Sequence, residues 1–162
     1  RCLKYDCLRA REVRGAPVAA ADLHLEIITY ETRVGVEHFI SLVTGQDKVA
    51  GFLRLSLPHS HTPTPSNEIA SAAIIRELHV YGPAISLGDD SSGEAQHLGL
   101  GTQLLAEAER LAGEAGFKKM AVISAIGTRE YYRKREFEVE GLYMTKPLTP
   151  HSLPCYPFPN TH

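Results

Sequence analysis

The order of elements along this sequence predicts an α/β (α+β) fold, a mixed, mostly antiparallel β-sheet with helices packed on it. Several strand-like segments come first, and a strand–helix–strand–helix–strand order follows them. The 162 residues suit one domain that buries about two-thirds of its unfolded surface. The net charge of −2 excludes a globally basic nucleic-acid binder.

The first half of the chain is expected to contain antiparallel strands. Leu23, Leu25 and Ile27 alternate with polar residues, which predicts a strand. The apolar segments 36–43 and 49–57 predict two more strands. Turn residues between these two segments, Gly45-Gln46-Asp47, predict that they form a hairpin.

A fourth strand is expected at 73–81, after a proline-rich loop at 58–67. A flexible loop at 82–95 then precedes a long amphipathic helix, and Gly116 is placed as its C-cap. The expected apolar face consists of Leu100, Leu104, Leu105, Ala108, Leu111, Ala112 and Ala115. The expected polar face consists of Gln103, Glu107, Arg110 and Glu114.

The last part of the domain is expected to complete the sheet. Residues 118–124 are almost wholly apolar, as in a strand with both faces covered. A short helix at 128–135 and strands at 137–141 and 143–147 follow it. In domain terms, the sequence predicts a junction at 1–21, a compact domain at 22–148 and a proline-rich tail at 149–162.

The cysteines and the hydropathy pattern bear on where the protein acts. The chain has three cysteines, Cys2, Cys7 and Cys155. This odd, sparse set suits neither a disulfide framework nor a four-ligand zinc site, so we expect a reducing compartment, the cytoplasm, and no metal. No apolar run approaches the ~20 residues of a membrane span, so no membrane contact is expected.

Two glycines near the start of the long helix need an explanation. Gly99 and Gly101 each cost roughly 1 kcal/mol relative to alanine inside a helix. Amides at a helix N-terminus attract phosphate, and glycine lets the anion approach the backbone. We therefore expect these glycines to precede the helix and to form a pyrophosphate cradle between it and the fourth strand.

Three phosphate motifs compete for this segment. A Walker loop needs a lysine before its serine or threonine, but Thr102 directly follows Gly101. A dinucleotide fingerprint needs a third small residue, where the sequence has Leu104. The remaining pattern, Q-x-x-G-x-G from Gln96 to Gly101, is similar to the coenzyme A pyrophosphate loop of the GNAT acetyltransferase superfamily.

Other segments extend the resemblance over nearly the whole chain. They are R-E-L-H-V-Y-G at 76–82, A-V-I-S-A-I-G-T-R-E-Y-Y-R-K at 121–134 and G-L-Y-M-T-K at 141–146. With Q-H-L-G-L-G they resemble the C-terminal acetyltransferase domain of Elongator catalytic subunits, which modify tRNA uridines. The sequence departs from that family at Glu136, where glycine is usual, at Leu142, where proline is common, and at Ala10, where cysteine is expected.

The resemblance implies a GNAT acyl-CoA N-acyltransferase fold with acetyl-CoA bound where the fourth and fifth strands splay apart. Pantetheine would pair with the strand edge formed by Glu77, Leu78, His79 and Val80. The pyrophosphate would lie on Leu98, Gly99, Leu100, Gly101 and Thr102, with Gln96 beginning the motif.

Catalytic candidates follow from the same resemblance. Tyr132 matches the family's CoA-contacting position and could return a proton to the departing thiolate; Tyr131 is the alternative. Adjacent helical positions differ by ~100°, so we expect one tyrosine to face the cleft and favour Tyr132. Glu77 and His79 share a strand face, and one could act as general base; alternatively, Glu77 pairs with a cation.

The implied reaction opens the acetyl-CoA thioester to supply the two-carbon unit for carboxymethylation of C5 of the tRNA wobble uridine. S-adenosylmethionine and an iron–sulfur cluster would belong to a separate upstream radical-SAM domain, a possible contact partner. The basic cluster Arg129, Arg133, Lys134 and Arg135 would contact tRNA phosphates or the CoA 3′-phosphate. Two alternatives stay open: an amine N-acetyltransferase, and a non-catalytic module that binds acetyl-CoA or tRNA.

Overall fold

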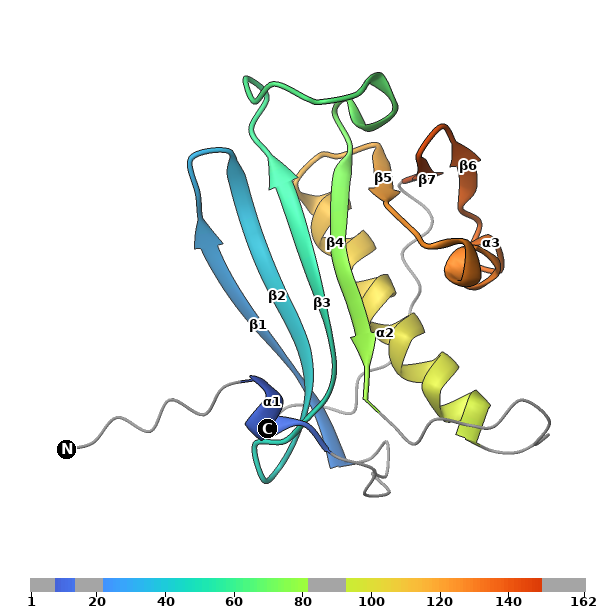
Figure 1. Cartoon of the computed structure of the whole chain (residues 1–162). Coiled ribbons are helices and arrows are strands. Elements are labelled where there is room, and N and C mark those ends of the chain that lie inside the picture. The colour runs from blue at the N-terminus through green and yellow to red at the C-terminus, as the bar shows by residue number, and fades with distance from the viewer. Residues whose placement is uncertain (1–7, 14–21, 82–92, 150–162) are drawn as a thin grey trace.

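The computed structural model describes residues 8–13, 22–81 and 93–149, without the side chains of Arg9 and of residues 93–98 (Figure 1). The expected irregular tail at 150–162, the loop at 82–92 and all three cysteines lie outside the described residues. The helices are α1 (Leu8–Arg11), α2 (Gly93–Glu114) and α3 (Arg129–Arg133). The strands are β1 (Leu23–Glu31), β2 (Gly35–Thr44), β3 (Val49–Pro58), β4 (Ala73–Val80), β5 (Lys119–Val122), β6 (Glu138–Glu140) and β7 (Tyr143–Pro147).

The strands form one seven-stranded sheet in the order β1-β2-β3-β4-β5-β7-β6. All neighbouring pairs are antiparallel except β4 and β5, which run parallel. The sheet confirms the expected mixed, mostly antiparallel fold and the β2–β3 hairpin. No helix within the described residues is long and apolar enough to cross a membrane.

Helix α2 covers one face of the sheet and contacts β2, β3 and β4 (Figure 1). Its buried residues are Leu104, Leu105, Ala108 and Ala112. They pack against alternate residues of the strands, including Leu53 and Leu55 of β3 and Ile75 of β4. Burial of such side chains contributes about 1.5–3 kcal/mol each, so this contact is the main core of the domain.

The C-terminal cap of α2 is the expected one, whereas the helix begins earlier than expected and ends one residue sooner. Gly116 has a φ of +87°, and the Phe117 amide donates to the Ala112 carbonyl oxygen, which is the expected glycine-capped C-terminus. The helix begins at Gly93, however, so the predicted loop at 82–95 is wrong for its last three residues. Ala115 was expected on the apolar face but lies past the last helical residue and is exposed.

Glu107 was expected on the polar face of α2 but is only 5% exposed. The Arg110 guanidinium donates to both of its carboxylate oxygens, at 3.0 and 2.6 Å. A bidentate partner of this kind compensates the desolvation of a buried carboxylate. The 3.6-residue pattern does not reveal this pairing because both residues look like ordinary surface charges.

Strand β5 is shorter than the expected 118–124 because its pairing with β4 ends at Ile75↔Val122. The next residue, Ile123, is 64% exposed, so the expectation of an apolar strand with both faces covered is wrong there. The expected helix at 128–135 is a 3₁₀ turn at Ile126–Thr128 followed by the five residues of α3.

A nearly buried ion pair joins α2 to β7. Lys146 Nζ donates to both carboxylate oxygens of Glu109, at 3.0 and 3.1 Å, and lies 3.3 Å from Glu136 Oε2. Burial raises the pKa of Glu109, and the hydrogen bonds from Lys146 oppose that rise. Glu136 itself has a φ of +67°, a left-handed conformation that favours glycine. The backbone at position 136 is therefore better suited to glycine than to glutamate.

The free energy of unfolding of Glu136→Gly should exceed that of Glu136→Ala by about 1 kcal/mol. The reason is that the left-handed conformation strains any residue with a Cβ. Both changes remove the contact with Lys146, so their difference isolates the backbone contribution. Urea unfolding of the two variants measures it. Equal midpoints and slopes would contradict this account.

Candidate functional site

The edge of β4 that faces β5 is paired over only part of its length. Residues 73–75 pair with 120–122 of β5, whereas no described strand pairs with this edge over 76–80. The opposite edge of β4 pairs with β3 as far as Gly51↔Val80. The two parallel strands thus diverge after Ile75, and Figure 1 shows the lower half of β4 lying apart from β5. Unpaired backbone groups of this kind can accept another extended chain.

Glu77 and His79 lie on this segment and share the sheet face opposite α2, as expected. The Glu77 carboxylate lies 3.8 Å from the Arg54 guanidinium on β3, so the alternative of a cation partner is realised for this residue. The His79 ring stacks on Phe52 at a centroid distance of 5.9 Å and contacts Tyr81 at 4.6 Å. The partly buried Leu78 and Val80 point to the other face and pack against the core.

Gly99 and Gly101 lie inside α2, so the prediction that they precede the helix is wrong. Free amides belong to the first turn of a helix, and in α2 that turn is formed by residues 93–96. The amides of Gly99 to Thr102 are therefore part of the helix. The helix continues through both glycines because each costs only roughly 1 kcal/mol, which the packing that begins at Leu100 offsets.

Gly101 makes room for a side chain from α3. A Cβ at Gly101 would overlap the Tyr131 hydroxyl oxygen, whereas a Cβ at Gly99 would meet no atom within 4 Å. The Tyr131 hydroxyl is buried and has no hydrogen-bond partner among the described residues. Burial raises the pKa of this hydroxyl, and the nearby Arg135 opposes the rise.

Tyr132 packs in the core and is only 6% exposed. Its ring meets Phe137 edge to face at 5.5 Å and Tyr131 at 5.3 Å. Burial, with a smaller contribution from Tyr131, raises the pKa of Tyr132 to about 12. Of the two tyrosines, it is Tyr131 whose hydroxyl reaches Gly101. Which tyrosine serves catalysis stays a prediction.

Arg135 turns back onto α2 instead of joining an outward basic cluster. Its guanidinium lies 3.6 Å above the Tyr131 ring and donates to the Tyr131 carbonyl oxygen at 2.8 Å. The same group donates to the Thr102 hydroxyl oxygen at 2.8 Å. The predicted cluster therefore divides: Arg133 and Lys134 are exposed, whereas Arg129 and Arg135 are partly buried. Arg133 lies 3.7 Å from Glu130, a weak surface pair.

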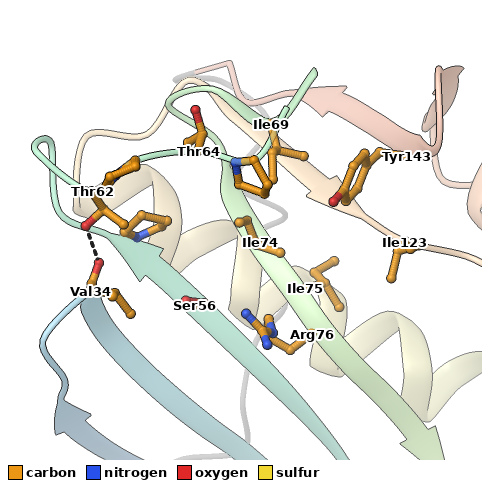
Figure 2. A pocket seen from close by; sticks show the side chains of 13 residues that line it. Val34, Ser56, Thr62, Thr64, Ile69, Ile74, Ile75, Arg76, Ile123 and Tyr143 are labelled. Atoms are coloured by element: carbon orange, nitrogen blue, oxygen red, sulfur yellow. Dashed lines mark hydrogen bonds between the residues drawn. The ribbon is translucent and has the colours of Figure 1, made fainter. Parts of the chain in front are cut away.

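A cavity of about 480 Å³ lies where β4 and β5 diverge, close to the loop that follows β3 (Figure 2). Its walls come from that loop, from β3, β4 and β7, from the turn between β1 and β2, and from the residue that follows β5. They include Thr62, Pro63, Pro65, Ile74, Arg76, Ile123 and Tyr143. The motifs of the sequence do not mark these residues as a site. The signals available were an arginine beside Glu77 on the predicted edge strand and a loop unusually rich in proline.

The residues around the diverging strands fit an acyl-CoA ligand in three respects. The β4 edge has unpaired backbone groups, as an extended pantetheine arm requires. The buried Tyr131 hydroxyl lacks a described partner, and a buried hydroxyl of this kind favours a ligand contact. Thr102 and Arg135 bring a hydroxyl and a cation to the middle of α2, where they could meet a phosphate.

The sheet, its covering helix and the strand divergence make up a GNAT-type acetyltransferase fold. A Desulfovibrio desulfuricans protein described as a GNAT-family acetyltransferase superimposes with a TM-score of 0.50 at 20% identity, covering 71% of this chain and 70% of that one. Nourseothricin acetyltransferase superimposes with a TM-score of 0.51 at 15% identity, covering 91% and 96%. At these identities the likeness concerns the fold alone.

The chain is homologous to the C-terminal region of the tRNA uridine(34) acetyltransferase and Elongator complex protein 3 family. It is 39% identical over 150 residues to the tRNA uridine(34) acetyltransferase of Dehalococcoides mccartyi, covering 90% of this chain and 33% of that protein. It is 38% identical over 151 residues to Elongator complex protein 3 of Danio rerio, covering 85% and 27%. No protein-family model matches the chain.

A solved structure agrees with these relatives. The archaeal Methanocaldococcus infernus Elp3 with an N-terminal deletion superimposes with a TM-score of 0.71 at 36% identity, covering 91% of this chain and 36% of that one. The chain thus spans about a third of the length of the proteins it matches. The homology and the structural matches confirm the expected fold class, the GNAT acyl-CoA N-acyltransferase fold.

The two helical glycines give opposite predictions for alanine substitution. Gly99→Ala should raise the free energy of unfolding by up to about 1 kcal/mol, because alanine favours the helix and nothing obstructs the new methyl group. Gly101→Ala should lack this gain, because the Tyr131 hydroxyl must move.

Combining Gly101→Ala with Tyr131→Phe should restore part of the gain, since the overlapping hydroxyl oxygen is gone and the ring carbon Cζ, 3.3 Å from the new methyl group, needs to move by only a few tenths of an ångström. The double-mutant cycle, measured by urea unfolding, should give a coupling of about 0.5–3 kcal/mol. Additive effects of the two changes would show that Gly101 is not there to admit Tyr131.

Proposed function

We propose that this chain binds acetyl-CoA and opens its thioester to supply the two-carbon unit for carboxymethylation of C5 of the tRNA wobble uridine. The observation that carries the proposal is the divergence of β4 from β5 after Ile75 in a chain homologous to a tRNA uridine(34) acetyltransferase. Acetyl-CoA, when bound, supplies an activated acetyl group as a thioester.

The β4 edge would hold the pantetheine arm. The backbone N–H and C=O groups of residues 76–80 on this edge are free of strand partners among the described residues. They would exchange hydrogen bonds with the amides of the arm, as in strand addition. In holding the arm, Glu77, Leu78, His79 and Val80 would therefore act through their backbone.

The middle of α2 would meet the diphosphate. Gly99 leaves its side of the helix open, and the Arg135 guanidinium donates to the Thr102 hydroxyl nearby. An arginine held in this way offers a fixed positive charge without a large loss of side-chain entropy. Gln96, Leu98, Leu100 and Gly101 belong to the same proposed contact segment of α2.

Tyr131 or Tyr132 would act as the proton donor. The raised pKa values of both hydroxyls keep them protonated at neutral pH, so either could donate a hydrogen bond to a sulfur or carbonyl atom. Tyr131 is the better placed of the two, because its hydroxyl lies against Gly101 and has no described partner. Glu77 or His79 remains a candidate base, although Glu77 pairs with Arg54.

The exposed Arg133 and Lys134 would contact tRNA phosphates, together with the partly buried Arg129. Action on tRNA would place the protein in the cytoplasm. Residues 22–148 would form the acetyltransferase domain. Radical chemistry with S-adenosylmethionine and an iron–sulfur cluster would belong to a further domain beside it. An amine N-acetyltransferase with the same fold is the second candidate, although no specific contact favours it.

The central experiment measures acetyl-CoA hydrolysis by the intact protein with and without tRNA. We expect tRNA to stimulate hydrolysis, and we expect Tyr131→Phe to reduce the stimulated rate by about 10²-fold or more, as the loss of a proton donor does. Tyr132→Phe is the matched control, expected to have the smaller effect. Lysine-peptide acetylation without any response to tRNA would overturn the proposed function.

A second experiment separates the two halves of the basic cluster. Arg135→Gln should weaken acetyl-CoA binding by about tenfold, the usual value of a charge-assisted hydrogen bond, and leave tRNA affinity unchanged. Arg133→Gln and Lys134→Gln should do the reverse and flatten the salt dependence of tRNA binding. Isothermal titration with acetyl-CoA and filter binding of tRNA measure the two affinities. An identical response of all three variants would contradict the division.

A further inference from the structure

We propose that the cavity between β4, β5 and the loop after β3 receives a single-stranded RNA nucleotide, with its phosphate on Arg76 and its base against Tyr143. The inference rests on the proposed function and names the acceptor side of that site. The cavity lies where the thioester arm along the β4 edge would end. Arg76 and Ile123 are the first residues after the last β4–β5 pair, Ile75↔Val122, and both line the cavity.

A β-bulge orients Arg76. The β3–β4 register passes from Leu55↔Ile75 to Arg54↔Glu77, so Arg76 has no cross-strand partner. The bulge interrupts the alternation of faces, and the consecutive residues Arg76 and Glu77 are both exposed. Bulges of this kind often re-aim a side chain beside a functional site. Figure 2 shows the Arg76 side chain beside Ile75, at the border of the cavity.

The charge of the cavity selects against an ammonium acceptor. Among the described residues that line it, Arg76 alone carries a charge at neutral pH. Arg76 makes no ion pair or hydrogen bond with any residue that the structure describes, whereas Arg54 on the same sheet face is paired with Glu77. An unpaired guanidinium suits a phosphate and repels a lysine side chain or another cationic amine.

The remaining walls suit a flat, neutral ring. Figure 2 shows Tyr143 and Ile123 on one side of the cavity and Val34 and Thr62 on the other. Ile123 and Val34 are 64% and 53% exposed, so each offers apolar side-chain surface to a ligand in the cavity. The volume of about 480 Å³ lies within the range of small-molecule sites. Aromatic stacking with apolar walls and one cation is the usual chemistry of single-stranded RNA recognition.

The test measures binding of a fluorescent pentauridylate to the intact protein by anisotropy, across a range of salt concentrations. Arg76→Gln should weaken binding by about tenfold and reduce the salt slope by about 0.7, the value for one phosphate contact on a single strand. Arg54→Gln is the matched control on the same face and should bind like the wild type.

Tyr143→Leu, which keeps an apolar side chain in the small cluster with Ile69 and Ala121, should also weaken binding by about tenfold. Tyr143→Phe should retain wild-type affinity because stacking is preserved. With an oligonucleotide whose central residue is abasic, Tyr143→Leu and the wild type should bind equally.

Several outcomes would overturn the inference. The wild type could fail to bind the oligonucleotide, or Arg76→Gln and Tyr143→Leu could both bind it like the wild type. Peptide lysine acetylation that survives in the wild type and is lost in Tyr143→Leu would assign the cavity to an amine. Loss of the proposed function is distinguishable, because it appears as absent acetyl-CoA binding or an absent tRNA response in the wild type while oligonucleotide binding persists.

Discussion

The pairing of β4 with β5 over only three residue pairs is the constraint on which the rest of the site depends. Backbone N–H and C=O groups are strong hydrogen-bonding groups, and leaving them unpaired near a core is costly. The unpaired stretch of β4 is nonetheless held in strand conformation, since its other edge pairs with β3 and its apolar residues Leu78 and Val80 pack against the core. The fold thus fixes a half-open edge and keeps it available to an extended ligand.

The same divergence creates two different surfaces. Beside the gap between the strands lie α3 and the turn that follows it, from which Tyr131 and Arg135 reach the middle of α2. The other face of the sheet, away from α2, carries the cavity bordered by Arg76 and Ile123. A thioester held on the β4 edge would lie between them, with proton-donating groups on the α2 side and the acceptor on the other. This two-sided arrangement accounts for both proposals with one structural feature.

The nearly buried ion pair between Glu109 and Lys146 connects the elements that carry these two surfaces. It ties α2 to β7, and β7 begins with Tyr143, a wall of the cavity. Such a pair is weak evidence for net stability, but loss of one partner would leave an uncompensated charge in the core. Its contribution is to fix the orientation of β7 relative to α2, on which the position of Tyr143 depends.

The sequence by itself determined the succession of strands along the chain, the long amphipathic helix, its glycine cap and the resemblance to the family, because hydrophobic periodicity, turn residues and motifs are local properties. It could also predict that Glu77 and His79 share a face, from the two-residue period of a strand. It could not predict that α2 starts six residues before Gly99, that Gly101 admits Tyr131, or that Arg135 leaves the basic cluster. Those outcomes, like the bulge that exposes Arg76, depend on how distant elements pack, so the tertiary structure alone decided them.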